Sequence, residues 1–219
     1  MDVSSQAEQS EAKESGPRMR TRRLLLDTTM ALMQAGRIPS VTDVAEAAVD
    51  SRATAYRYFP TQAALVQAAV GEALGPILAW RSSSADAEER VEELLACAYP
   101  RLDEYEATLR AALLQAMEQW SRRRAGLLGD EAPIVRGNRR DLLGSALAPL
   151  RGRVGAAEFD RLRQALSLLF GTEAFVVLKD IWGLDGSQAR DVALWSAHAL
   201  VRAAVAEAET AGRAAARQV

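Results

Sequence analysis

The chain has 219 residues, of which 49% are hydrophobic, and its formal net charge is −2. This length and apolar content suffice for a substantial core, which excludes a disordered chain and allows one large domain or two modest ones. The single cysteine, Cys97, excludes an internal disulfide and a cysteine-rich zinc site, and we expect it to be a small core residue. No stretch reaches the apolar length needed to cross a bilayer, so we expect a cytoplasmic protein without membrane contact.

The charges are unevenly distributed along the chain. Residues 1–17 carry a net charge of −3, whereas residues 18–62 carry a net charge of +3. The first segment is polar and lacks the apolar core of a signal peptide, so it is predicted to be a flexible tail. The second segment is the candidate for contact with nucleic acid.

The first predicted helix covers Leu24 to Met33 and ends before Gly36. Arginines precede it, among them Arg20 and Arg23. They either contact DNA phosphates and an adjacent minor groove or form a solvated helix start. We favour contact, because the next segment has the composition of a DNA-reading helix.

Residues 41–59 are predicted to form two short helices joined by a tight turn. Ser40 and Asp43 each satisfy a backbone donor at the start of the first helix, and Ser51 is the predicted cap of the second. Val49 lies in the turn. Its β-branched side chain resists a positive φ, so the turn is predicted to be strained or differently shaped.

The second of these helices carries polar groups that a buried helix does not tolerate. They are Arg52, Thr54, Tyr56, Arg57 and Tyr58. Arginine suits bidentate recognition of guanine edges or phosphate oxygens, threonine bonds a base or touches a thymine methyl, and tyrosine hydroxyls hold phosphates. The composition therefore predicts a helix that enters a DNA major groove.

Residues 40–65 resemble the DNA-binding helix-turn-helix of the TetR (tetracycline-repressor-type) family of transcriptional regulators. The resemblance is carried by Val44, Ala45, Ala47, Ala48, Ser51, Thr54, Tyr56, Arg57, Tyr58, Phe59, Pro60 and Leu65, and in the preceding helix by Leu25, Leu26, Asp27, Leu32 and Gly36. The chain departs from the family pattern at Val49, Asp50, Ala53, Ala55 and Gln62, where the family usually has Gly, an apolar residue, Gly, Leu and Lys.

The resemblance implies an all-α protein with an N-terminal three-helix DNA-binding domain over residues 18–62. A larger helical domain for effector binding and dimerisation would follow over residues 63–219. The DNA contacts implied are Ser40, Ser51, Arg52, Ala53, Thr54, Tyr56, Arg57, Tyr58, Gln62, Arg20 and Arg23.

Further helices are predicted in chain order from apolar residues at helical spacing. One begins after Thr61, and another covers Ala85 to Tyr99 and is halted by Pro100. The next places the apolar residues of 102–120 on one face. Residues 130–137 are predicted to be a loop, and a helix follows it.

The two longest apolar segments, 156–182 and 187–209, are separated by a glycine-containing turn. They are predicted to pack antiparallel, and two copies of this hairpin would form a four-helix bundle across a two-fold axis. The resemblance implies the same homodimer. The alternative is a hairpin buried in the core of its own chain.

The resemblance also implies a pocket for a small apolar or amphipathic effector. The helices that would enclose it carry Tyr99, Tyr105, Met117, Trp120, Phe170 and Glu173. Each is otherwise an ordinary core residue, since any helical bundle needs apolar residues at this spacing. Glu173 stands out, because a carboxylate on an apolar face needs a partner, which is an effector, an arginine or water.

The sequence contains no catalytic motif, and its only histidine, His198, lies in a predicted helix among apolar residues. We expect neither an enzyme nor a cofactor or metal. The expected function is a sequence-specific transcriptional regulator, a homodimeric repressor that binds a near-palindromic site in double-stranded DNA and is released by its effector. The alternative is an all-helical protein-interaction module that has lost specific DNA binding.

Overall fold

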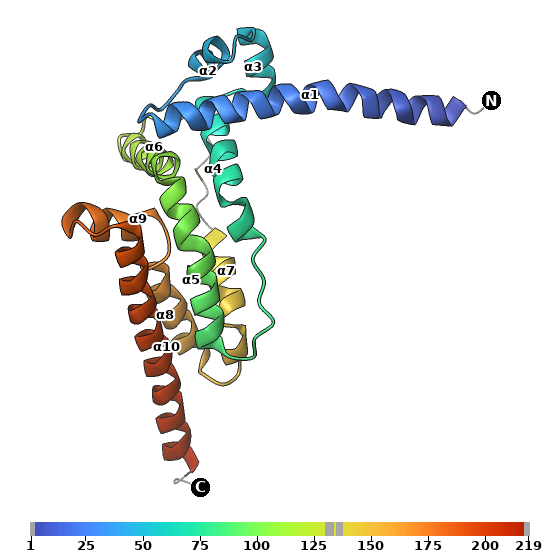
Figure 1. Ribbon diagram of the computed structural model, residues 1–219. Coiled ribbons are helices and arrows are strands. Elements are labelled where there is room, and N and C mark those ends of the chain that lie inside the picture. The colour runs from blue at the N-terminus through green and yellow to red at the C-terminus, as the bar shows by residue number, and fades with distance from the viewer. Residues whose placement is uncertain (1–2, 130–133, 135–137, 217–219) are drawn as a thin grey trace. The chain divides into compact units, whose positions relative to one another are not determined.

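A computed structural model describes the backbone of residues 3–129, 134 and 138–216, and the side chains of residues 16–129, 134 and 138–214. Within these ranges the regular elements are all helical, which confirms the predicted all-α class (Figure 1). In chain order they are α1 (Val3–Gln34), α2 (Val41–Ala47), α3 (Arg52–Tyr58), α4 (Gln62–Leu78), α5 (Ala87–Glu104), α6 (Glu106–Arg124), α7 (Asn138–Ala146), η1 (Ala148–Leu150), α8 (Ala156–Ser167), α9 (Thr172–Phe175), η2 (Val176–Ile181) and α10 (Gly186–Ala216). No helix in the described ranges combines the length and apolarity needed to span a membrane.

The chain divides into two compact units at places that differ from the predicted domain boundary after residue 62. Unit 1 comprises residues 1–72 and 107–132, and unit 2 comprises residues 73–106 and 133–219. The difference arises because α4 runs unbroken past the predicted boundary, and because α6 packs against the N-terminal helices. Sequence order alone cannot reveal that a helix returns to an earlier unit.

Unit 1 is built on the C-terminal half of α1. One core cluster joins this half to α2, α3 and the start of α4 through Leu25, Leu26, Val41, Val44, Ala45, Ala55, Phe59 and Leu65. A second cluster joins it to α4 and α6 through Met33, Val66, Ala69 and Ala111. The short helices α2 and α3 therefore pack against the longer helices α1 and α4. Isolated helices of about seven residues are not stable in water, so they need this packing.

Helix α1 is longer than the sequence predicts. It continues back to Val3, through most of the predicted flexible tail over residues 1–17, with Pro17 inside the helix. Besides its serines the tail contains three glutamates, two glutamines and two alanines, which are good helix formers. A polar composition indicates that a segment is exposed to solvent. It does not show whether that exposed segment is a helix or a coil.

Unit 2 is organised around the pairing of α5 with α10, which lie side by side along much of their length (Figure 1). Small residues of α10 are fully covered at steps of four, namely Ala189, Ala193 and Ala197. Their size lets the two helix backbones approach closely. The larger side chains of α10 lie outside this covered row, and Trp195 is 74% exposed.

Two predicted helix ends are also wrong. Helix α5 passes through Pro100 and ends at Glu104. Pro100 lacks a backbone N–H, so the helix has one hydrogen bond fewer at this position. The residues beyond Pro100 nevertheless remain helical and include Leu102, whose side chain is buried. The predicted continuous helix over 156–182 is broken by Gly171, whose φ of 135° lies outside helical values, and continues as α9 and the π-helical turn η2.

Two smaller expectations have different outcomes. The predicted loop over 130–137 lies outside the described residues except for Ile134. The side chain of Cys97 is exposed on α5, and is not the core residue that its apolar neighbours predict. It lies on the solvent side of a helix whose opposite face, including Leu94 and Leu95, is buried.

Candidate nucleic-acid interface

The turn between α2 and α3 places a valine in the left-handed backbone region. Val49 has a φ of 55° and its side chain is 94% exposed. The amide of Val49 donates to Glu46 O at 3.2 Å, and the amide of Asp50 donates to Ala45 O at 2.9 Å. This is the Schellman pattern, which normally uses glycine at the position of Val49. The predicted strain is therefore present and is confined to one residue.

Replacing Val49 with glycine is expected to stabilise unit 1 by about 0.5 to 1 kcal/mol. Glycine removes a left-handed penalty of roughly 1 to 2 kcal/mol, and part of this gain is offset by the greater freedom of glycine in the unfolded chain. Urea unfolding measures the change. Val49→Ala is the matched control, because it shortens the side chain but keeps the steric conflict. A glycine variant no more stable than the alanine variant would show that the turn is unstrained.

Both caps of this region form as the sequence predicts. The Ser40 side chain accepts from the Asp43 amide at 3.1 Å, and the Asp43 carboxylate accepts from the Ser40 amide at 2.8 Å. The Ser40 hydroxyl also donates to the Asp43 carboxylate at 2.8 Å. The bonds from the Ser40 backbone and hydroxyl lower the pKa of Asp43, so the cap contributes its full stability above the ordinary aspartate pKa and is lost as the pH falls through the lowered pKa. Ser51 caps α3 by accepting from the Thr54 amide at 3.1 Å.

Helix α3 has one buried and one exposed face. Ala55 and Phe59 are buried against unit 1 and fix the helix in place. Arg52, Tyr56 and Arg57 are exposed on the other side, with Tyr56 at 47% exposure. The exposed face therefore presents two guanidinium groups and a phenol from a helix whose position is set by its core contacts.

The polar groups of α3 already have neighbours within the chain. Arg52 forms an ion pair with Glu46 at 2.5 Å, although both side chains are more than half exposed. The Tyr56 hydroxyl lies 3.5 Å from the hydroxyl of Thr42 on α2. The Arg57 guanidinium lies 5.4 Å from the centre of the Tyr58 ring. Exposed ion pairs are weak, typically below about 1 kcal/mol, so Arg52 can exchange Glu46 for a phosphate or base at little cost.

The other predicted contacts differ in their availability. Arg20 is exposed, whereas Arg23 forms ion pairs with Asp27 at 3.0 Å and with Glu72 at 2.6 Å. The Gln62 amide donates to the Pro39 carbonyl at 3.2 Å. Gln62 therefore ties the start of α4 to the loop before α2. Its local role is structural.

Ala53 is exposed on α3, and its methyl group leaves room for close approach of a partner. Two residues of this surface were not predicted. Thr42 shares a face with Tyr56, and Glu46 is the counter-ion of Arg52. Their spacing in the sequence crosses a turn, so helical periodicity does not reveal these pairings.

The residues predicted for an effector pocket have different environments. Tyr99 and Phe170 are buried in unit 2, where the Tyr99 hydroxyl donates to Leu169 O at 2.7 Å. Burial raises the pKa of Tyr99, so this phenol stays protonated. Tyr105 lies beneath the Arg101 guanidinium, 4.4 Å from its ring centre.

Glu173 has a partner within the chain. Its carboxylate accepts from Arg139 of α7 at 2.7 Å, and the same guanidinium donates to Ser167 O at 3.2 Å. The partner of the Glu173 carboxylate in the structure is therefore an arginine. The Arg139–Glu173 ion pair connects α7 to the start of α9, directly after the break at Gly171.

Met117 and Trp120 belong to unit 1 and are 60% and 66% exposed. Unit 2 contains a cleft of about 240 Å³ between the start of α5, η1 and the C-terminal half of α10. Its lining is Asp86, Ala87, Glu88, Leu150, Arg153, Val201, Arg202, Val205, Ala206 and Glu209. None of the six residues predicted for the effector belongs to this cleft.

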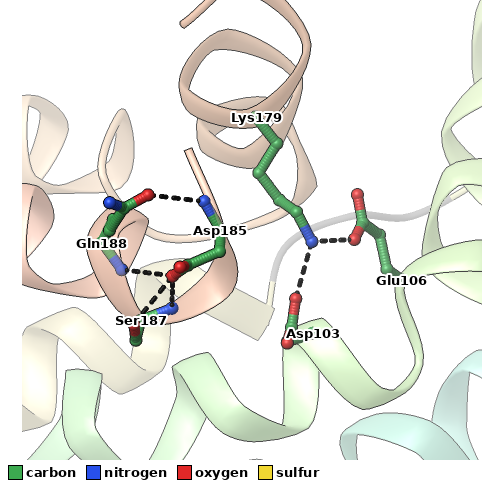
Figure 2. A network of polar contacts seen from close by, with 6 residues as sticks. All are labelled: Asp103, Glu106, Lys179, Asp185, Ser187 and Gln188. Carbon is green, nitrogen blue, oxygen red and sulfur yellow. Dashed lines mark hydrogen bonds and ion pairs between the residues drawn. The ribbon is translucent and has the colours of Figure 1, made fainter. Parts of the chain in front are cut away.

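A polar network in unit 2 connects η2 with α5 and the first residue of α6. Figure 2 shows Lys179 between two carboxylates, those of Asp103 at 2.7 Å and Glu106 at 2.5 Å. Burial alone would lower the pKa of Lys179, but its hydrogen bonds to both carboxylates outweigh burial and raise it. The network is thus complete below the ordinary lysine pKa and is lost as the pH rises above the raised value. Beside it, Asp185 accepts from Ser187 and Gln188 at the start of α10.

Gly186→Ala is expected to destabilise unit 2 by about 1 kcal/mol. An added Cβ would lie 2.5 Å from Asp103 Oδ2, so the carboxylate must move away from Lys179 and lose a charge-assisted hydrogen bond. Urea unfolding measures the change in the wild type and in an Asp103→Ala background. The substitution should cost little in that background. An equal cost in both would show that it acts on the backbone of α10 and not on the network.

Comparison with known proteins gives no match: no family model, no curated protein and no solved structure is similar to this chain. Function is therefore inferred from its own residues.

Proposed function

We propose that the chain is a sequence-specific DNA-binding transcriptional regulator of the TetR type, acting in the cytoplasm. The observation that supports this most is the exposed face of α3, where Arg52, Tyr56 and Arg57 project from a helix anchored by Ala55 and Phe59. A helix with outward arginines and a fixed core side suits insertion into a major groove.

The residues of this surface have different roles in the proposal. Arg52, at the N-terminal end of α3, reads a base edge after leaving Glu46, and the neighbouring Thr54 and Ala53 approach the groove floor. Tyr56 and Arg57 hold phosphates, which fixes the register of the helix without reading sequence. Arg20 on α1 adds a further phosphate or minor-groove contact.

A homodimer would place two α3 helices on one site. Unit 2 exposes large apolar side chains on the predicted dimerisation segments, namely Leu168, Val177, Ile181, Trp182, Val192 and Trp195. Exposed apolar residues of this size are common at subunit interfaces. In the proposed dimer the two α3 helices lie roughly 34 to 36 Å apart and meet successive major grooves of a near-palindromic site.

The proposed regulation is repression relieved by a small apolar or amphipathic effector. An effector that binds better to a state with altered spacing of the two α3 helices would release DNA by shifting the population. This step rests on the family resemblance alone.

The first experiment measures binding of the purified protein to DNA from upstream of its own gene while the salt concentration is varied. A dimer with about six to ten phosphate contacts should lose roughly 10³- to 10⁵-fold in affinity between about 50 and 200 mM salt. A random duplex of equal length is the control for specificity. Equal affinity for both duplexes, or affinity that does not depend on salt, would contradict the proposal.

Two substitutions separate base reading from phosphate binding. Arg52→Ala should relax preference at one base position by about 1 to 3 kcal/mol, because a bidentate base contact is lost. Tyr56→Phe should weaken operator and random DNA alike, because only a phosphate contact is lost. Affinities measured on a set of singly substituted operators test both. Equal losses on operator and random DNA for both variants would refute these roles.

The alternative function is an all-helical protein-interaction module. The ion pairs that engage Arg52 and Arg23 favour it, since they neutralise two of the arginines proposed to meet DNA. The strained turn at Val49 also departs from the family pattern. Under this alternative no duplex binds with a steep salt dependence, so the same assay separates the two functions.

A further inference from the structure

Within the described residues, only one of the two arginines on α3 has a carboxylate partner. Oε1 of Glu46, on α2, lies 2.5 Å from Nη2 of Arg52. The Arg57 guanidinium instead lies beside the Tyr58 ring. The ion pair therefore involves the arginine proposed to read a base, and not the arginine proposed to hold a phosphate.

Glu46 occupies N–H donors of Arg52 that DNA would also use. A guanidinium binds a carboxylate, a phosphate or the edge of a guanine through the same N–H groups, so these acceptors compete for it. Glu46 and Arg52 are both more than half exposed, so DNA can reach the pair. An exposed ion pair contributes at most about a fivefold factor to an equilibrium constant. DNA can therefore displace Glu46, but the displacement lowers the affinity for DNA by up to this factor.

The Glu46 carboxylate stays close to α3 when Arg52 leaves it. Its neighbours Val44 and Ala45 are buried in the core cluster that also contains Ala55 of α3, so the two helices are held together. After displacement the carboxylate would lie beside the DNA-facing side of α3, near the phosphates and without Arg52 to neutralise it. Repulsion between these like charges adds to the cost of breaking the ion pair.

We propose that Glu46 is an internal competitor of DNA at Arg52, which holds the base-reading guanidinium in the free protein and lowers the affinity for the operator. This inference rests on the proposed function, because it requires that Arg52 enter a groove. In a homodimer the ion pair is broken at both α3 helices, so a loss of about two- to fivefold at each helix becomes about 4- to 25-fold. The operator complex is therefore weaker, and easier to release, than the contacts of Arg52 alone allow.

The test compares the wild type with Glu46→Gln, which removes the charge and keeps the size of the side chain. Full-length protein is titrated against a fluorescein-labelled duplex from upstream of its own gene, and fluorescence anisotropy gives the affinity between about 50 and 200 mM salt. At the lowest salt the variant should bind about 4- to 25-fold more tightly than the wild type. The gain should shrink as the salt concentration rises, because salt screens exposed ion pairs.

Asp50→Asn is the matched control, because it also removes one negative charge close to Arg52 in the sequence. The Asp50 carboxylate accepts from the Ser51 amide at 2.6 Å, and the asparagine oxygen can keep this bond. Over the residues that the structure describes, Asp50 has no basic partner. Its substitution therefore measures the general effect of one negative charge fewer, and the gain in affinity should be smaller than for Glu46→Gln.

An Arg52→Ala background separates competition for the guanidinium from general repulsion of DNA. Glu46 has no guanidinium to hold in this background, so Glu46→Gln should increase the affinity no more than Asp50→Asn does. The single and double variants form a double-mutant cycle, which isolates the interaction between Glu46 and Arg52 in the DNA-binding step. Urea unfolding of each variant checks that these exposed substitutions leave the fold intact.

Two results would overturn the inference while the proposed function stands. One is specific binding by the wild type with the same affinity for Glu46→Gln. The other is a gain for Glu46→Gln that only equals the gain for Asp50→Asn, or that persists in full in the Arg52→Ala background. If the wild type and Glu46→Gln each bound upstream and random duplexes equally, the proposed function would be refuted, and this inference with it.

Discussion

Phe59→Ala is expected to destabilise unit 1 by about 3 to 5 kcal/mol, the usual cost of truncating a buried phenylalanine. The ring is 3% exposed and joins α3 to the cluster that contains Leu25, Val44 and Leu65. It lies directly after α3, so its loss leaves a cavity where the helix meets α1 and α4. Hydrogen exchange of the Val44 and Ala45 amides measures the effect, because both residues belong to the same cluster.

Tyr56→Ala is the matched control for this prediction. Tyr56 is an aromatic residue of the same helix, but it is 47% exposed, so its truncation should change the stability of unit 1 by less than about 0.5 kcal/mol. Exchange of the Ala193 amide in unit 2 should remain unchanged in both variants. If the two truncations had similar effects on Val44 and Ala45, the assignment of inner and outer faces of α3 would be wrong. The proposed DNA contacts depend on this assignment.

Gly171→Ala is expected to destabilise unit 2 by about 3 kcal/mol. Gly171 has a φ of 135° and an extended ψ, a region that only glycine adopts readily and that costs other residues of order 1 to 3 kcal/mol. An added Cβ would also lie 2.8 Å from the Arg139 guanidinium and 3.1 Å from the Glu173 carboxylate. The substitution therefore disturbs the ion pair that fastens α7 as well as the backbone. Urea unfolding of the variant measures the total.

Gly183→Ala separates these two causes. Gly183 has a φ of 69°, and an added Cβ would have no atom within 4 Å. Its substitution should cost only the left-handed backbone penalty, roughly 1 to 2 kcal/mol. Equal costs at the two glycines would show that the Arg139 contact is unimportant, and a neutral Gly171→Ala would show that glycine does not impose the break after α8.

Local features of this chain were predictable from the sequence alone. The caps at Ser40 and Ser51, the strain at Val49 and the short helix that begins at Arg52 follow from interactions between residues at most a few positions apart. Such interactions depend on side-chain chemistry and on backbone preference, which the sequence specifies directly. The all-α class follows in the same way from helical periodicity repeated along the chain.

Pairings between distant segments were decided only by the tertiary structure. Periodicity shows that a helix has an apolar face, but it does not show which neighbour covers that face. For this reason periodicity does not identify the buried alanines of α10, and it predicts Met117 and Trp120 to be core residues although both are exposed. The partners of Arg52 and Glu173 likewise come from other helices, Glu46 and Arg139. Burial and ion pairing depend on which helices meet, and only the packed chain fixes that.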